Sequence, residues 1–263
     1  MILETSMHLL MPVSETLHVR GFLLGIENWL KSLGIVPELA AISAPGISRR
    51  PFQFERARKR LQEEDVEQAR HGSLFTRRLG SESFQDTVFN ASFGVGKDSV
   101  VGVSHDLRVI TAAQWMALAV ALRPSLPFVY GYVYTMPEAR GPFWYATGTG
   151  YDNILGPNNN KVENRMLEKW GRALRLDAGP RNVLIRQVYS LQLLSDAHLA
   201  LRVGVKSLRE WIEASKENGK LESMVPGIWA WCLDGARNVR AANEALSAVG
   251  LLAAWDPQAN EVL

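Results

Sequence analysis

Three residue types used in hydrolytic catalysis stand side by side at Ser104-His105-Asp106. In catalytic triads the nucleophile, the base and the group that orients the base meet in space, and immediate neighbours along a chain do not normally reach that geometry. Coincidence explains the run better than catalysis. The enzyme alternative is a hydrolase or transferase whose active site converges from distant segments, with His105, Asp106 and His198 as the first residues to test.

Two glycine-rich stretches look like nucleotide-binding loops but lack the required spacing. A phosphate loop has a glycine six positions before its lysine and Ser or Thr after it, whereas Lys97 has Ala91 and Asp98 there. Gly148-Thr149-Gly150 brings no third glycine at the spacing of a dinucleotide-binding loop. The first stretch is better explained as a hairpin turn, and the sequence predicts no cofactor.

The histidines do not predict a metal site. The five are scattered, and none forms a pair at the helical spacing typical of zinc ligands. A zinc site would need ligands from distant segments, so no metal is expected. The sequence therefore predicts a protein that binds another protein, and not an enzyme. The five are His8, His18, His71, His105 and His198.

Aromatic residues are the best candidates for a binding surface, because Trp and Tyr dominate the energetics of protein interfaces. Eight tryptophans are present. Trp144 and Tyr145 lie in a loop-rich segment and are predicted to contact a partner. Four tryptophans fall on apolar helix faces and are predicted to be core residues: Trp29, Trp115, Trp170 and Trp211.

A run of acidic side chains is the second candidate contact surface. It follows a basic block on a predicted charged helix over 54–71, and it could contact a basic partner. A charge run is more often a solvated helix face, which is the competing interpretation. The acidic residues are Glu63, Glu64, Asp65 and Glu67.

Composition limits the function classes. The chain has 263 residues, 47% of them hydrophobic, enough to build a large core. A net charge of +2 disfavours a nucleic-acid binder. The single cysteine, Cys232, fits a reducing compartment, no secretory signal is recognisable, and the apolar stretch 112–122 is too short to cross a membrane. We expect a cytoplasmic protein.

Strands and single helices follow one another without a regular βαβ rhythm, which favours an α+β fold with a mixed or mainly antiparallel sheet and packed helices. We expect an N-terminal α+β subdomain over 1–136, a loop-rich connection over 137–160 and a C-terminal α+β subdomain over 161–263, unless the chain is a single domain. The predicted elements are strands at 8–11, 89–95, 100–104, 128–135, 183–190 and 228–233, an irregular segment over 35–53, and helices capped by Ser14, Thr111 with Gln114, Asn160 with Glu163, Ser207 with Glu210, and Asp234.

The C-terminal third resembles the immunity protein 52 family of bacterial polymorphic-toxin and type VI secretion systems. The likeness covers roughly residues 182–252 and is a series of short words in matching order. It is carried by Arg186, Val188-Tyr189-Ser190-Leu191, Leu194-Ser195, His198-Leu199, Gly204, Leu208-Arg209, Trp211-Ile212, Leu221-Glu222 and Gly227-Ile228-Trp229-Ala230-Trp231.

The resemblance implies a cytoplasmic α+β immunity protein that neutralises a cognate effector, typically a nuclease of the restriction-endonuclease-like type. It would act by covering the effector's active cleft, with no nucleic acid or membrane as a direct partner. Inhibitors of nucleases are often strongly acidic, whereas this chain is nearly neutral. That departure points to local patches, or to a contact away from the nucleic-acid cleft. A structural assembly subunit is a third interpretation.

Overall fold

The chain folds into helices and mainly antiparallel strands, which confirms the predicted α+β class. Contacts divide it into two compact units, Thr5–Phe128 and Met1–Glu4 with Val129–Leu263. This division falls before the predicted connection over 137–160; separate domains stay a prediction. The computed structural model describes residues 3–12, 14–43, 52–60, 62, 64–69, 71–77, 87–93, 98–104, 109–137, 141–148, 161–175 and 183–258.

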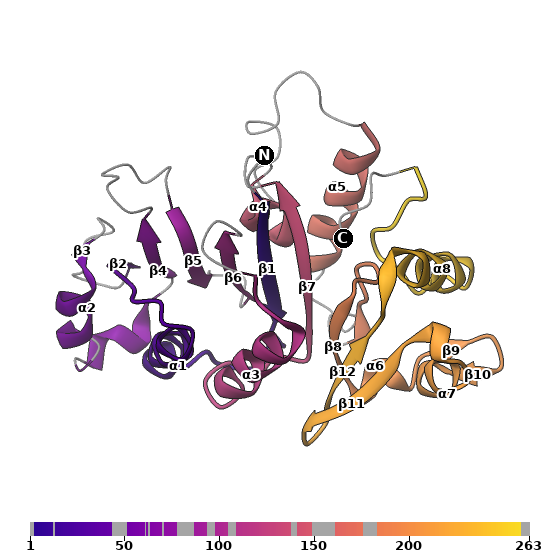
Figure 1. Cartoon of the computed structure of the whole chain (residues 1–263), viewed down its shortest axis with the longest axis horizontal. Helices are drawn as coiled ribbons and strands as arrows, with labels where there is room; N and C mark the ends of the chain where they lie inside the picture. The colour runs from indigo at the N-terminus through magenta and orange to yellow at the C-terminus, as the bar shows by residue number, and fades with distance from the viewer. Residues whose placement is uncertain are drawn as a thin grey trace. The chain divides into compact units, whose positions relative to one another are not determined.

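The first unit contains the strand order β1-β6-β5-β4-β2-β3 (Figure 1). Its pairs β3–β2, β2–β4, β4–β5 and β5–β6 are antiparallel. The predicted pairing of the strands at 89–95 and 100–104 is thus confirmed. The elements are β1 (Leu3–Leu10), α1 (Val19–Ser32), β2 (Leu39–Ser43), β3 (Phe52–Gln53), α2 (Phe54–Arg60), a 3-10 helix (Glu64–Gln68), β4 (His71–Arg77), β5 (Thr87–Phe93), β6 (Asp98–Ser104) and α3 (Ala112–Leu122).

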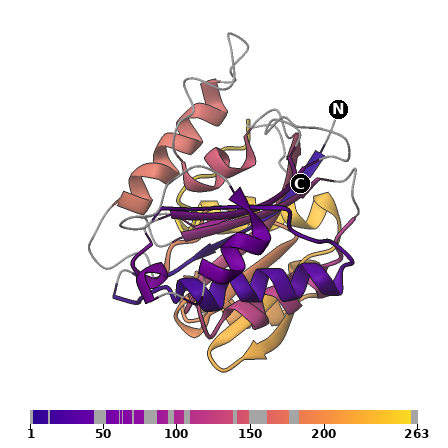
Figure 2. The ribbon, with the colours of Figure 1, turned by 90° about the vertical axis from the view of Figure 1, so that its left-hand side faces the viewer.

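Helix α1 packs its apolar face on the strands of this unit (Figures 1 and 2). The ring of Phe22 meets that of Phe93 edge to face, with centroids 5.6 Å apart. On the neighbouring helix α3, Trp115 lies 5.3 Å from Trp29, and the Trp29 indole donates to the carbonyl of Gln114. Both tryptophans are buried, so these two predicted core residues are confirmed.

Two predictions in this unit were wrong. The irregular segment over 35–53 contains β2 and β3, and Ala40 and Ile42 alternate into the core on β2. The charged helix ends at Arg60, and part of the acidic run forms a 3-10 helix. Like charges four residues apart, such as Arg56 and Arg60, weaken a helix, which is consistent with the early end.

The second unit contains the antiparallel order β11-β12-β8-β7 and a separate hairpin, β9–β10 (Figure 1). Trp170 is buried at its centre, as predicted, whereas Trp211 is only half-buried. The elements are β7 (Tyr130–Pro137), α4 (Pro142–Thr147), α5 (Lys161–Arg175), β8 (Leu191–Ser195), α6 (Asp196–Leu199), β9 (Arg202–Val203), β10 (Lys206–Ser207), α7 (Leu208–Glu213), a 3-10 helix (Lys216–Asn218), β11 (Lys220–Val225), β12 (Ile228–Cys232) and α8 (Gly235–Ala248).

The predicted strand over 183–190 is mostly irregular. It forms one isolated parallel bridge, between Ile185 and Leu252, and the regular strand begins only at Leu191. The side chain of Asn243 on α8 bonds both the N–H and the carbonyl of Val188. The carbonyls of Ile185 and Arg186 accept instead from the N–H groups of Ala253 and Ala254. Scattered partners thus satisfy the backbone of this segment without a regular strand.

Helix caps were predicted well where the capping residues are local. Thr111 with Gln114 and Ser207 with Glu210 form capping boxes. Ser14 was wrong: α1 begins after His18, whose side chain makes no capping bond. Asp234 precedes α8 as expected, but its side chain does not bond the helix.

Candidate functional site

Within the acidic run, Glu67 is the one residue whose side chain the structure describes. Glu67 turns to the start of α1, where its carboxylate accepts from the backbone N–H groups of Val19 at 2.9 Å and Arg20 at 3.1 Å. A carboxylate is favoured there because it satisfies free N–H groups at the positive end of the helix. Glu64 and Asp65 lie in the 3-10 helix. Glu63 lies outside the described residues.

Trp144 and Tyr145 lie on α4, a short helix inside the segment predicted as a loop. Their environments differ: Trp144 is 39% exposed, while Tyr145 is buried and shares a hydroxyl hydrogen bond of 3.0 Å with Tyr189. The exposed part of the Trp144 side chain is accessible to a partner. Tyr145 is occupied by packing, and its predicted contact would need a rearrangement.

Of the three residues of the enzyme alternative, the structure describes only His198. His105 and Asp106 lie outside the described residues. His198 is fully buried, stacks on Tyr130 and takes part in a capping box with Ser195, whose hydroxyl lies 2.7 Å from Nδ1. The other ring nitrogen lies 3.3 Å from the carbonyl of Leu184. These contacts describe a histidine that stabilises the fold.

Burial lowers the pKa of His198 to about 4, from an ordinary value of 6.5. The folded protein therefore holds a neutral ring, and only the unfolded chain takes up the proton as the pH falls below 6.5. The free energy of unfolding should fall by up to about 1.4 kcal/mol per pH unit between pH 6.5 and 4 from this group. Above pH 6.5 the contribution is complete.

Substitution of His198→Gln tests this expectation in urea unfolding measured at several pH values. Glutamine keeps a polar group at the capping position and does not titrate. Between pH 6.5 and 4, the free energy of unfolding of the variant should depend less steeply on pH than that of the wild type, by the uptake of one proton. An unchanged dependence would show that His198 is accessible and titrates normally in the folded protein.

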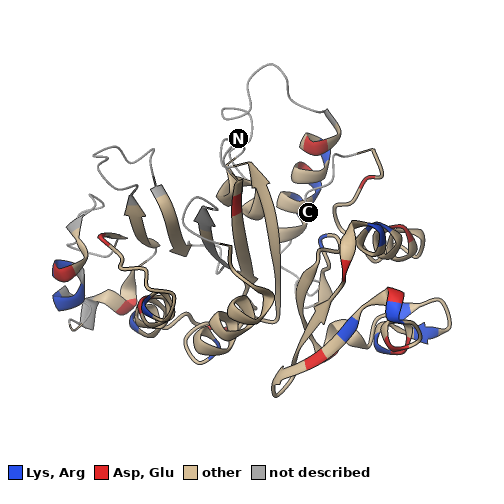
Figure 3. Cartoon of the chain, in the orientation of Figure 1, with Lys and Arg blue, Asp and Glu red and all other residues tan. Residues whose placement is uncertain are grey.

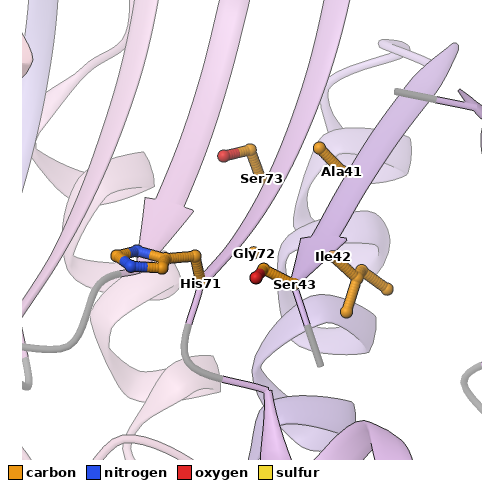
Figure 4. Close-up of a pocket in the computed structure, with 6 residues that line it drawn as sticks. All are labelled: Ala41, Ile42, Ser43, His71, Gly72 and Ser73. Atoms are coloured by element: carbon orange, nitrogen blue, oxygen red, sulfur yellow. The ribbon is translucent and has the colours of Figure 1, made fainter. Parts of the chain in front are cut away.

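A depression of about 260 Å³ lies at the ends of β2 and β4 (Figure 4). Ser43 and His71 are register partners there, so a hydroxyl and an imidazole line the same place. Figure 4 shows the His71 ring turned away from Ser43. No carboxylate lines the depression among the described residues, so it does not assemble a triad.

Among the described residues, no three His, Cys, Asp or Glu side chains come together as a metal site. Within the same residues, no helix combines the length and apolar character needed to cross a membrane.

The most unusual buried group is Arg186, which is fully buried among aromatic rings. Its guanidinium lies 3.8 Å from the ring centre of Tyr145 and farther from those of Tyr132 and Trp170. Nη1 donates to the Tyr132 hydroxyl at 2.9 Å and to the Tyr145 carbonyl at 2.7 Å. We call these four residues the Arg186 cage.

Aromatic faces, and not a carboxylate, compensate the charge of Arg186. Nε and Nη2 have no hydrogen-bond acceptor within the described chain. A cation over an aromatic face is stabilised by about 2 kcal/mol when both are desolvated. Burial also raises the pKa of Tyr189, which keeps this neighbouring phenol neutral. The cage therefore joins α4, α5 and β7 to the irregular segment, and its role is structural.

A second arginine stacks on an aromatic ring at the surface. The Arg209 guanidinium lies 3.9 Å from the ring centre of Trp229, and the Trp229 indole donates to Asp196 at 2.7 Å. These residues come from α7, β12 and α6, and we call them the Trp229 cluster. The side chain of Arg209 is 33% exposed and that of Asp196 68%. Three elements thus hold a half-buried indole and an arginine in fixed positions at the surface.

The sequence analysis did not select the Trp229 cluster, although Arg209 and Trp229 lie within the words that carry the family resemblance. Alternation along the strand Ile228–Cys232 places Trp229 and Trp231 on the same face, so the strand pattern does not separate their environments. Trp231 is fully buried, and Trp229 is half-buried. The difference in burial between the two indoles therefore comes from the elements packed around each one, which the strand pattern does not specify.

The described residues define an α+β protein with a core arginine cage and a preorganised surface cluster. No protein-family model matches the chain, and no curated protein matches it. Among solved structures it is similar to a Pseudomonas aeruginosa T6SS protein, with 13% identity and a TM-score of 0.49 over 100% of this chain and 78% of that chain. The function proposed below rests on the residues of this chain.

Proposed function

We propose that the chain is an immunity protein that binds and neutralises a cognate toxic effector by protein contact. The effector would be a nuclease delivered by a type VI or polymorphic-toxin system, and binding would take place in the bacterial cytoplasm. The Trp229 cluster is the observation that carries the proposal. The family resemblance in the same part of the chain supports the choice of partner.

Trp229 and Arg209 keep part of their surface exposed to solvent. Trp and Arg are the residue types most enriched among residues that dominate interface energies. Here the hydrogen bond to Asp196 and the stack of Arg209 fix the Trp229 indole before any partner arrives. A side chain that is already ordered loses little rotamer entropy on binding, so more of its contact energy contributes to affinity.

The test of function begins with the neighbouring genes: where one encodes a large secreted protein, its C-terminal domain is coexpressed with this chain. We expect the chain to restore growth of cells that produce the active domain and to copurify with an inactivated domain in a fixed ratio. Failure of both results would refute the proposal.

Two substitutions then test the surface. Trp229→Ala should weaken binding of the inactivated domain by at least about 2 kcal/mol, roughly 30-fold in Kd, as expected for a central interface tryptophan. Arg209→Ala should weaken binding in the same direction, because it releases the ring. Isothermal calorimetry measures both.

Arg240→Ala is the matched control for Arg209→Ala. Each arginine is partly exposed and pairs with a glutamate four residues on, Glu244 and Glu213 respectively, but only Arg209 stacks on Trp229. The control should leave affinity unchanged. Equal affinities for the wild type, Arg209→Ala and Trp229→Ala would move the contact elsewhere, and Trp144→Ala would then test the surface predicted from the sequence.

A further inference from the structure

The exposed face of α5 carries an excess of positive charge. Of the exposed side chains that the structure describes on this helix, Glu168 is acidic and the other four are basic. None of the five forms a hydrogen bond or ion pair with another described residue. Figure 3 shows blue segments, which mark Lys or Arg, and red segments, which mark Asp or Glu, along α5. We call the basic residues the α5 face: Arg165, Lys169, Arg172 and Arg175.

Packing fixes the direction of the α5 face. The opposite side of the helix is buried through Met166, Leu167, Trp170 and Leu174. The Trp170 indole donates to the carbonyl of Ala146 on α4 at 2.7 Å, so the helix is locked against rotation. The face runs from Arg165 to Arg175, about 15 Å along the helix.

Charge pairs along α5 largely offset one another, because Glu168 lies at attractive spacing from Arg165 and Arg172. Like charges three or four residues apart cost about 0.2–0.5 kcal/mol per pair, and Lys169 repels both Arg165 and Arg172. The whole chain carries only +2, so this charge is concentrated locally. A local excess of one sign in an otherwise balanced protein raises the association rate with a surface of opposite sign.

We infer that the α5 face docks on an acidic surface of the protein partner. This inference rests on the proposed function and adds the chemistry of the contact. A protein is the occupant of choice because a single helical stripe of four charges on a nearly neutral chain is small for tracking a nucleic-acid backbone, which rewards many phosphate contacts. A nucleic acid is the competing occupant.

The sign of the α5 face also locates the contact on a nuclease effector. The cleft of a nuclease must attract phosphates and is basic, so a basic helix is repelled by it. The α5 face therefore docks outside the nucleic-acid cleft. The two surfaces act on different rate constants. The α5 face sets the association rate constant, and the Trp229 cluster, which holds the complex once it is formed, sets the dissociation rate constant.

The test compares two matched pairs of substitutions. Lys169→Gln with Arg172→Gln neutralises two charges three residues apart on α5, and Arg237→Gln with Arg240→Gln does the same on α8. Glutamine is a good helix former, so both variants should fold, which circular dichroism checks. Stopped-flow fluorescence then gives association and dissociation rate constants with the inactivated effector domain.

For the α5 variant we expect the association rate constant at about 20 mM salt to fall roughly tenfold, with the difference vanishing near 0.5 M salt. Its dissociation rate constant should stay within about twofold of the wild type, because rim charges act mainly on association. The α8 variant should associate like the wild type. An α5 variant that associates at the wild-type rate at low salt overturns the inference while the proposed function stands.

A second arm tests the competing occupant. A labelled 20-base-pair DNA duplex is titrated with the wild type and the α5 variant at the same low salt. We expect no saturable binding by either protein. Binding by the wild type that the variant loses would assign the α5 face to nucleic acid and overturn the inference. A wild type that binds neither the domain nor the duplex refutes the proposed function and the inference together.

Discussion

Substitution of Arg186→Ala is expected to lower the free energy of unfolding by about 3–5 kcal/mol, the range for removing a large buried side chain. The change empties the centre of the Arg186 cage and removes the cation stacked on Tyr145. It also takes the donor from the Tyr145 carbonyl, a buried acceptor. Urea unfolding followed by tryptophan fluorescence measures the loss.

The matched control is Arg209→Ala. It also removes a guanidinium stacked on an aromatic ring, 3.9 Å from the ring centre, but this one lies at the surface. Its effect on the free energy of unfolding should be below about 1 kcal/mol, because exposed ion pairs and stacks contribute little. Arg186→Met separates volume from charge: it refills the cage without its donors and should fall between the wild type and Arg186→Ala. Equal stabilities of Arg186→Ala and Arg209→Ala would show that the cage is not desolvated.

Substitution of Gly171→Ala should also be strongly destabilising, by about 2–3 kcal/mol, near the upper range for overpacking. A Cβ atom at Gly171 would lie 2.3 Å from the carbonyl oxygen of Gly148, which is backbone and cannot rotate away. Gly148 itself has a φ of +63°, so it cannot easily adjust. The substitution must push α4 from α5, and thermal unfolding measures the result.

Gly25→Ala is the control for helix propensity. Gly25 also lies inside a helix, but its added Cβ would meet the flexible end of Leu122 at 3.0 Å. The propensity gain of about 1 kcal/mol should offset the small rearrangement, so its stability should stay close to that of the wild type. If both alanine variants were equally stable, the close approach of α4 and α5 would not be a constraint.

The pairing of side chains with nearby backbone was predictable from the sequence. Thr111 and Gln114 meet because three residues of helix bring them together, and Ser207 and Glu210 meet for the same reason. Alternation over Phe89, Ala91 and Phe93 likewise indicated β5, since a strand places every second side chain on one face. These signals need no knowledge of the rest of the chain.

Long-range contacts escaped the same reasoning. The group that satisfies the start of α1 is Glu67, 48 residues from Val19, and no local pattern links the two. The segment over 183–190 has the composition of a strand, but Asn243 takes the backbone groups that a partner strand would use. Both errors arose where a side chain distant in sequence decided the local structure.

The candidate site shows the same division. The α+β class, the local caps and the high tryptophan content, from which a binding role was predicted, follow from the sequence alone. The environment of each aromatic residue depends on the tertiary structure: Tyr145 stacks on Arg186 in the core, whereas Trp229 stacks on Arg209 at the surface. Burial depends on elements that meet in space from far along the chain, and hydrophobic patterning within one element does not specify its neighbour.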